Sequence, residues 1–246
     1  MSLKVPWLAV HPDSPFPPPE MALRDPDGLL AVGGDLSPPR LLNAYRHGVF
    51  PWFSEGQPIL WWSPDPRTVF RTDAVRLSSR FRRSLRRSDW VVCADTAFAQ
   101  VLDACATASR PGQRGTWITD DMRAAYLGLH RLGHAHSVEV FAGERLVGGI
   151  YGVAIGNMFF GESMFSGESG GSKVALAALA LRLQAMGWPL IDAQVENSHL
   201  LSLGAQSWPR SKFLAQLREL VAKPGGLIGP WTGWFGEMPA AALARP

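Results

Sequence analysis

Several features that mark other protein classes are scarce or missing in this 246-residue sequence. Only two cysteines occur, Cys93 and Cys105, and neither belongs to a CxxC pair, so neither a disulfide framework nor a zinc site is predicted. The longest apolar run, Val174 to Leu181, is far shorter than a membrane span. The apolar run within residues 1–10 is interrupted by Pro6 and is too short for a signal peptide. We therefore expect a cytoplasmic protein that contacts no membrane.

Net charge is also small, at +3, but the positive charge is concentrated in residues 71–90. This segment carries seven arginines against two aspartates. On a helix, Leu77, Phe81 and Leu85 would form an apolar stripe. The arginines would occupy two other faces: Arg76, Arg80, Arg83 and Arg87 on one, and Arg82 with Arg86 on the next. Such a helix suits a phosphate backbone, and a solvated surface helix is the alternative, although solvated faces usually mix both signs of charge.

Prolines and glycines are frequent in the first 66 residues, which predict a small, irregular N-terminal domain, 1–66. Its one expected helix begins at Pro38 or Pro39, is capped by Ser37 and ends before Gly48. Pro64 to Pro66 would then form a stiff joint to a second domain, 67–246.

Five aromatic rings lie among the thirteen residues from Phe50 to Trp62, separated by prolines and polar groups. Aromatic side chains on a stiff loop lose little entropy when they stack on a flat ligand such as a nucleobase, so a stacking surface is predicted. The alternative is a plug of hydrophobic core beneath a loop.

The second domain shows a series of helical and strand patterns. Helices are expected at 95–106, 120–132, 172–186 and after Asn197, and strands at 137–141, 145–153, 158–165 and 189–195. An antiparallel meander followed by helix, strand and helix predicts an α+β fold with a mixed, largely antiparallel sheet and flanking helices. The tail after Lys223 is expected to be loosely packed.

Two carboxylates fall inside apolar strands, Glu162 and Asp192. A buried carboxylate needs a cation, hydrogen-bond donors or a substrate. Strand alternation places Gln194 on the same face as Asp192, and an acid beside an amide suits the handling of an amine. A structural salt bridge to an arginine is the alternative for either acid.

Competing motifs are weaker. Gly167 to Gly171 fits the GxSxG nucleophile elbow, with Ser169 followed by Asp192 and His199, but the spacing is too short for an α/β-hydrolase. The segment from Arg145 to Ile150 nearly matches the pyrophosphate loop of CoA-dependent acyltransferases, but its last residue is not small.

His134 and His136 lack further metal ligands at familiar spacing, and no P-loop or Rossmann pattern occurs. We therefore expect neither a metal nor another cofactor.

Several long motifs occur together and in order. They are 28–37 (GLLAVGGDLS), 50–54 (FPWFS), 61–67 (WWSPDPR), 115–119 (GTWIT), 133–137 (GHAHS), 161–166 (GESMFS) and 191–195 (IDAQV). With these motifs the chain resembles the leucyl/phenylalanyl-tRNA–protein transferases from Phe16 to Arg210. The resemblance implies a small N-terminal domain and a larger domain of the acyl-CoA N-acyltransferase type that uses aminoacyl-tRNA in place of CoA. It also implies transfer of Leu, Phe or sometimes Met to the α-amino group of proteins that begin with Arg or Lys, which marks them for degradation.

The resemblance also implies residue roles. Trp52 and Trp117 would pack around the terminal adenosine of the tRNA, with Tyr45 nearby. Ile150 and Phe159 would line an apolar pocket for the amino-acid side chain. Because the family often has methionine in place of Ile150, the preference among Leu, Phe and Met stays open.

We expect Asp192 and Gln194 to orient the acceptor amine and help to remove its proton. Glu162 would hold either the aminoacyl adenosine or the basic side chain of the acceptor, and the division of roles between the two acids stays open. The arginine helix would grip the acceptor stem through its phosphates. A CoA-dependent N-acyltransferase and a noncatalytic RNA-binding module are the alternatives.

Overall fold

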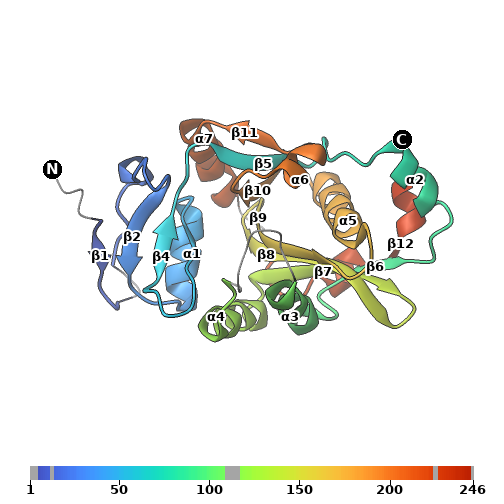
Figure 1. Ribbon diagram of the computed structural model, residues 1–246, viewed down its shortest axis with the longest axis horizontal. Helices are drawn as coiled ribbons and strands as arrows, with labels where there is room; N and C mark the ends of the chain where they lie inside the picture. Colours follow the sequence, from blue (N-terminus) through green and yellow to red (C-terminus); the bar gives the residue numbers. More distant parts are fainter. Residues whose placement is uncertain (1–4, 12–13, 109–116, 224–226, 245–246) are drawn as a thin grey trace.

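A computed structural model describes residues 5–11, 14–108, 117–223 and 227–244 of the protein. It contains two β-sheets that lie one after the other along the long axis of the molecule (Figure 1). The first sheet comes from the N-terminal 62 residues, and the second is built from strands between Arg67 and Pro239.

The N-terminal sheet has four short strands in the order β1-β2-β4-β3. Its elements are β1 (Trp7–Leu8), the 3-10 helix η1 (Pro19–Met21), β2 (Leu29–Gly33), α1 (Pro38–Arg46), β3 (Phe50–Pro51) and β4 (Leu60–Trp62). Helix α1 confirms the prediction, and Gly48, with φ of 72°, follows its end as expected. Ser37 precedes the helix, but its side chain makes no capping hydrogen bond.

The larger sheet has eight strands in the order β11-β5-β10-β9-β8-β7-β6-β12. They are β5 (Arg67–Arg71), β6 (Val91–Ala94), β7 (Ala135–Ala142), β8 (Arg145–Ile155), β9 (Met158–Ser166), β10 (Leu190–Gln194), β11 (Gln206–Trp208) and β12 (Met238–Pro239). Among the described strands of this sheet, only β9 and β10 pair in parallel, so the predicted mixed and largely antiparallel sheet is confirmed.

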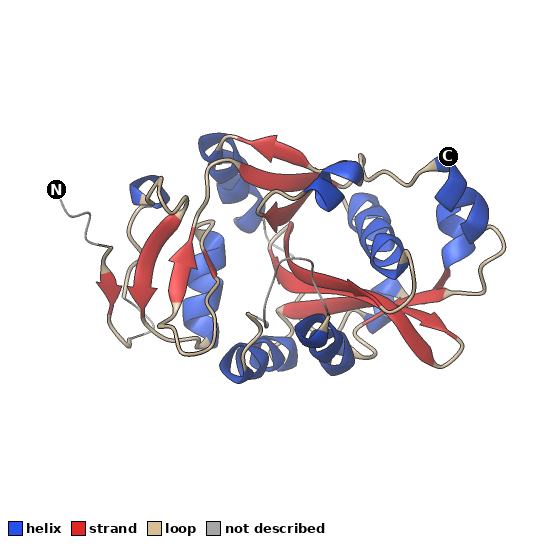
Figure 2. Ribbon diagram, in the orientation of Figure 1, coloured by secondary structure: helices blue, strands red, loops and turns tan. Residues whose placement is uncertain are grey.

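Helices cover both faces of the larger sheet (Figure 2). They are α2 (Ser79–Leu85), α3 (Phe98–Thr107), α4 (Asp120–Arg131), α5 (Gly171–Ala185), α6 (Ser198–Ser202), α7 (Arg210–Val221), α8 (Thr232–Phe235) and the 3-10 helix η2 (Ala240–Ala244). Two predicted helix starts change. Helix α3 begins at Phe98, because the Ala97 before it has a non-helical backbone with φ of −145° and Asp95 has a left-handed one with φ of 57°. Ser172 lies inside α5, which begins after Gly170.

The alternation of side chains along β8 separates two cores. Tyr151 and Val153 face α3, α4 and the N-terminal sheet, whereas Ile150 and Ala154 face α5 and the C-terminal tail. The first core is continuous from Trp61 of the N-terminal sheet to the larger sheet, so the two parts of the chain pack as one body.

The arginine helix is shorter than predicted. Its regular part is only α2, capped by the side chain of Ser78, which accepts from the Phe81 N–H at 3.2 Å. Arg76 lies outside because its backbone N–H bonds to the carbonyl of Leu203 at 2.7 Å. Gly170, with φ of 94°, lets the Phe81 ring pack closely on the start of α5, since a Cβ at Gly170 would lie 2.4 Å from that ring.

The tail after Lys223 was predicted to be loosely packed, and this prediction is wrong for residues 227–244. Trp231, Phe235 and Ala240 have no exposed surface, and Met238 extends the large sheet through β12. The apolar side chains of this segment complete the second core, which a count of its prolines and glycines does not reveal.

Within the described residues, no helix combines the length and the apolar character needed to cross a lipid bilayer.

Candidate active site

Strands β9 and β10 bring Glu162 and Gln194 together. The two strands pair in parallel from Met158 and Leu190 to Phe160 and Asp192, and the pairing ends there, although β9 continues to Ser166. Irregularities follow on both strands, beside Glu162 on β9 and between Asp192 and Gln194 on β10. As a result the two side chains face each other where the strands separate, with Gln194 held at φ of 61°.

Glu162 is the centre of a polar cluster from three other elements. Its Oε1 accepts from the Tyr45 hydroxyl of α1 and from Nε2 of Gln194, both at 2.8 Å, and its Oε2 accepts from the Tyr126 hydroxyl of α4 at 2.6 Å. The two tyrosine oxygens lie 2.6 Å apart. Both tyrosines are buried, while Glu162 and Gln194 are half-buried. We call Tyr45, Tyr126, Glu162 and Gln194 the Glu162 cluster.

Proton counting shows that the cluster accommodates a protonated Glu162. The oxygens of Tyr45, Tyr126 and Glu162 make three mutual contacts, and each hydrogen bond needs one proton. The two hydroxyl groups supply two protons, so a protonated carboxyl group would supply the third. Burial, opposed by the hydrogen bonds from the tyrosines, raises the pKa of Glu162 to about 7. The pKa values of both tyrosines lie well above 10.0, because of burial first and the nearby Glu162 second, so both remain neutral donors.

Asp192 occupies a different environment, since a guanidinium group binds it on both oxygens. Nε and Nη2 of Arg67 lie 2.8 and 2.6 Å from Oδ1 and Oδ2 of Asp192, and neither side chain is exposed. Arg67 also donates to the Gly48 carbonyl at 3.1 Å and packs between the rings of Phe50 and Phe213.

The structural salt bridge that was the alternative for Asp192 is present as this buried ion pair. Asp192 has no exposed surface, and the bidentate guanidinium occupies both of its oxygens, so any direct contact with an amine stays a prediction. Oδ1 of Asp192 also accepts the backbone N–H of Gln194 at 2.9 Å. Asp192 therefore helps to hold Gln194 in its left-handed conformation.

Comparison with known proteins identifies the family. Residues 34–65 match the family model described as leucyl/phenylalanyl-tRNA protein transferase N-terminal domain, and residues 69–218 match the model for leucyl/phenylalanyl-tRNA protein transferase. A leucyl/phenylalanyl-tRNA–protein transferase from Xanthomonas axonopodis pv. citri is 69% identical over 246 residues, which cover 100% of this chain and 98% of the relative. The chain belongs to the leucyl/phenylalanyl-tRNA–protein transferase family.

Two further relatives with the same name agree with this assignment. The Xanthomonas euvesicatoria protein is 71% identical over 97% of this chain and 95% of its own length, and the Xylella fastidiosa protein is 64% identical over 94% of both. A solved structure, L-PGS from Bacillus licheniformis, aligns with a TM-score of 0.37 at 11% identity over 69% of this chain and 54% of its own, which is too weak a likeness to assign the fold. The resemblance seen in the motifs is thus confirmed, and the chain is an aminoacyl-tRNA-dependent transferase.

The residues that the family resemblance implied for adenosine are not equally accessible. Trp52 is 42% exposed and lies beside the half-buried Trp62, with ring centroids 5.9 Å apart. Trp117 is buried, and the ring of Tyr45 is enclosed while its hydroxyl bonds Glu162. Trp52 is therefore the indole of this set that offers a free face.

The aromatic segment from Phe50 to Trp62 is mainly core. Phe50, Phe53 and Trp61 are buried, and Trp61 donates its indole N–H to the Gly33 carbonyl at 2.8 Å. The predicted stacking surface is wrong for these three rings, because all three pack in the first core. The alternative of a hydrophobic plug describes them.

Ile150 and Phe159 lie together in the second core, on the face of the sheet that α5 covers. They are 5% and 1% exposed, so both side chains are enclosed in this core. Tyr126 was missed by sequence reasoning. A signal existed, because Met122, Tyr126 and Leu129 share the apolar face of a helix and a buried tyrosine hydroxyl needs a partner.

The competing motifs do not assemble into sites within the described residues. Ser169 and His199 are exposed, and both oxygens of Asp192 bind Arg67, so no catalytic triad forms. Gly148 of the CoA-like motif lies inside β8, where a Cβ would be 2.4 Å from the Gly171 Cα, so this glycine serves close packing of α5. The described residues hold no group of three or more ligands for a metal near His134 and His136 or elsewhere.

The arginine segment, residues 76–87 around α2, lies far from the N-terminal sheet, at the other end of the molecule (Figure 1). Five guanidinium groups are exposed there, and none makes an ion pair with an acid of the described chain: Arg76, Arg80, Arg83, Arg86 and Arg87. Arg82 is half-buried. The segment therefore presents uncompensated positive charge to solvent, although its regular helix is short.

Proposed function

We propose that this transferase forms its peptide bond at the Glu162 cluster, moving Leu or Phe, and sometimes Met, from tRNA to the α-amino group of proteins that begin with Arg or Lys. The new first residue would mark the acceptor for degradation. One observation carries the proposal: a half-buried carboxyl group with a pKa of about 7 faces an amide where two strands separate.

The reaction needs little more than position and proton transfer, because an aminoacyl ester is already activated. The acceptor nitrogen attacks the ester carbon, a C–N bond forms, and the C–O bond to the terminal ribose breaks. One proton leaves the amine and one is gained by the ribose oxygen, so no net proton is released.

Glu162 suits the proton-transfer step. A free α-amino group has a pKa of about 7.7–8.0, close to that of Glu162, so a proton passes between them at small cost. In this proposal ionised Glu162 accepts the amine proton and returns it to the ribose oxygen. Gln194 orients the reacting groups, and the Arg67–Asp192 pair holds Gln194 in place.

We also propose that the larger domain, from residue 67 onward, is of the acyl-CoA N-acyltransferase type. Support comes from a mixed sheet with a single parallel pair in its described part, whose two strands separate after three paired residues. The separation offers an acyl donor access to the sheet, as aminoacyl-tRNA requires. Trp52 would then contact the terminal adenosine, and Ile150 and Phe159 the amino-acid side chain.

The transfer is tested with purified protein, radiolabelled Leu-tRNA and a peptide that begins with Arg. Label should enter that peptide and not a matched peptide that begins with Glu. Acetyl-CoA in place of Leu-tRNA tests the CoA-dependent alternative. Binding of Leu-tRNA without transfer would instead indicate a noncatalytic RNA-binding module and contradict the proposal.

Contact with tRNA is proposed at the arginine segment. Replacing Arg80, Arg83 and Arg87 by Gln should weaken tRNA binding and reduce the slope of log K against log salt by roughly two to three, since about 0.7–0.9 counterions are released per phosphate contact. Arg131 of α4 is exposed and lies outside this segment, so Arg131→Gln is the control. An unchanged slope in the triple variant would mean that these arginines are only solvated.

A further inference from the structure

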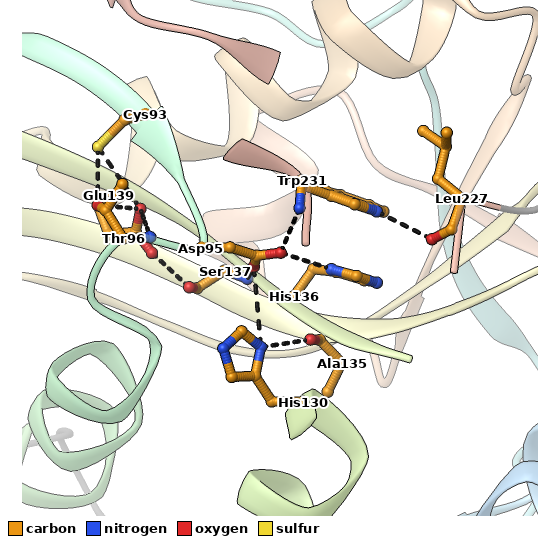
Figure 3. A network of polar contacts seen from close by, with 10 residues as sticks. All are labelled: Cys93, Asp95, Thr96, His130, Ala135, His136, Ser137, Glu139, Leu227 and Trp231. Atoms are coloured by element: carbon orange, nitrogen blue, oxygen red, sulfur yellow. Dashed lines mark hydrogen bonds and ion pairs between the residues drawn. The ribbon is translucent and has the colours of Figure 1, made fainter. Parts of the chain in front are cut away.

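A buried carboxylate outside the Glu162 cluster organises the C-terminal tail. Asp95 follows β6 and has no exposed surface on its side chain. Its two oxygens accept the backbone N–H groups of Ser137 at 2.9 Å and Trp231 at 2.7 Å, and Nδ1 of His136 lies 2.8 Å from Oδ2 (Figure 3). Asp95 therefore ties the backbone of Trp231 to β7 of the large sheet, and the backbone of Asp95 at this point is left-handed.

The indole of Trp231 is held on several sides. The imidazole of His136 stacks on it at 4.0 Å with an angle of 6°, and the rings of Trp188 and Trp234 meet it edge-on. Its Nε1–H donates to the Leu227 carbonyl at 3.2 Å (Figure 3). With no exposed surface, Trp231 has little freedom to move.

Phe159 rests against this indole. The centroids of the two rings are 5.7 Å apart, at an angle of 42°. On another side the Phe159 ring packs over Gly152, where a Cβ would lie only 2.7 Å from Cε1 and Cζ of Phe159. The Phe159 ring is thus confined between the backbone of β8 and the indole of Trp231.

We infer that Trp231 is a specificity-determining residue, because it sets how far Phe159 can retreat from the side chain of the transferred amino acid. This inference rests on the proposed role of Phe159 in the amino-acid pocket. Trp231 lies beyond residues 69–218, to which the family model for the larger domain is matched, so the comparisons assign it no role.

The physical argument concerns volume. A rigid indole behind Phe159 limits the pocket to side chains of a certain size, because a packed core has no spare space. A smaller side chain at position 231 would let Phe159 move back, which favours the larger Phe over Leu. Pocket changes of this size alter discrimination by roughly 10-fold or more.

The test compares wild type with Trp231→Phe, which retains the backbone N–H that binds Asp95. With Leu-tRNA and Phe-tRNA as donors and one peptide that begins with Arg, the ratio of kcat/KM for Phe over Leu should rise roughly tenfold. The matched control is Trp234→Phe, because Trp234 contacts Trp231 but makes no ring contact with Phe159 among the described residues. Its ratio should stay at the wild-type value.

A ratio in Trp231→Phe that stays within twofold of wild type would overturn the inference. If that variant does not fold, as judged by circular dichroism, the more adaptable Trp231→Met replaces it and the same ratio decides. The two proposals fail differently: if the proposed function is wrong, wild type shows no transfer with either tRNA, whereas if only this inference is wrong, transfer persists with an unchanged preference.

Discussion

Glu162 and Asp192 lie on neighbouring strands of one sheet, yet their surroundings differ in kind. Asp192 faces the guanidinium of Arg67, which matches both of its oxygens and has no exposed surface. In the part of the chain that the structure describes, Glu162 accepts hydrogen bonds from neutral donors, two phenols and an amide, on α1, α4 and β10. Burial raises the pKa of Glu162 to about 7, and the hydrogen bonds from its neutral donors offset only part of that rise.

The contrast suggests a structural role for the Asp192 ion pair and a chemical role for Glu162. The ion pair joins β5 to β10 and helps to fix the conformation of Gln194. Glu162 has a pKa of about 7, which is near the pKa of the α-amino group that it is proposed to deprotonate. A carboxylate in an apolar strand was the signal for both residues. Their partners, and not their strands, distinguish the two acids.

The largest effect on stability is expected for Asp192→Ala, which removes the ion pair. Removing one member of a buried ion pair leaves the guanidinium of Arg67 uncompensated, and the free energy of unfolding should fall by about 3–5 kcal/mol. Urea unfolding followed by circular dichroism measures the loss. Asp73→Ala breaks the exposed pair with Arg71 and should barely move the midpoint. Equal midpoints for the two variants would show that burial of the Asp192 pair does not matter.

Glu162→Gln removes the titrating group and keeps its shape. We expect kcat for transfer to an Arg-starting peptide to fall roughly 100-fold, because general-base catalysis contributes at least that much. The KM for the peptide should remain near wild type. Glu168→Gln, which alters the exposed partner of Arg145 beyond β9, is the control and should keep full activity. If KM rose while kcat was retained, Glu162 would instead hold the basic side chain of the acceptor.

The pH dependence of stability also tests the difference between Glu162 and Asp192, and its expected effect on the free energy of unfolding is smaller. The pKa of Glu162 rises from 4.5 in the unfolded chain to about 7 in the folded one, so the folded state binds the proton more tightly. Its contribution to stability is therefore complete below about pH 4.5 and is lost as the pH rises through about 7. For a half-buried group the loss should be about 2 kcal/mol.

Urea unfolding of wild type and Glu162→Gln between pH 5 and pH 8 measures this loss. The difference in unfolding free energy between the two proteins should change over that interval and level off above it. A difference that is constant with pH would mean that Glu162 is already ionised in the folded protein at pH 5.

Much of the secondary structure follows from local pattern. The run from Arg145 to Val153 was predicted as a strand, and β8 contains it; the helix expected at 120–132 is α4 within one residue. Predictions from composition succeeded less well. The rings of Phe50 to Trp62 and the tail from residue 227 were misjudged, because aromatic or glycine content does not show which way a side chain faces.

The candidate site was only half accessible from the sequence. Glu162, Asp192 and Gln194 stood out as polar residues in apolar strands, and this pattern survives in the structure. Tyr126 and the guanidinium partner of Asp192 were missed, because they are distant in the chain: Tyr126 lies 36 positions from Glu162, and Arg67 lies 125 positions from Asp192.

By itself, the sequence determined the family, the order of most strands and helices, the concentration of positive charge and the presence of acids in apolar strands. These properties depend on motifs, on periodicity and on formal charge, all of which are local. Only the tertiary structure decided which acid meets a guanidinium and which meets hydroxyl groups. The free energy of ionisation depends on the groups within a few ångströms in space, and folding brings those groups together from distant parts of the chain.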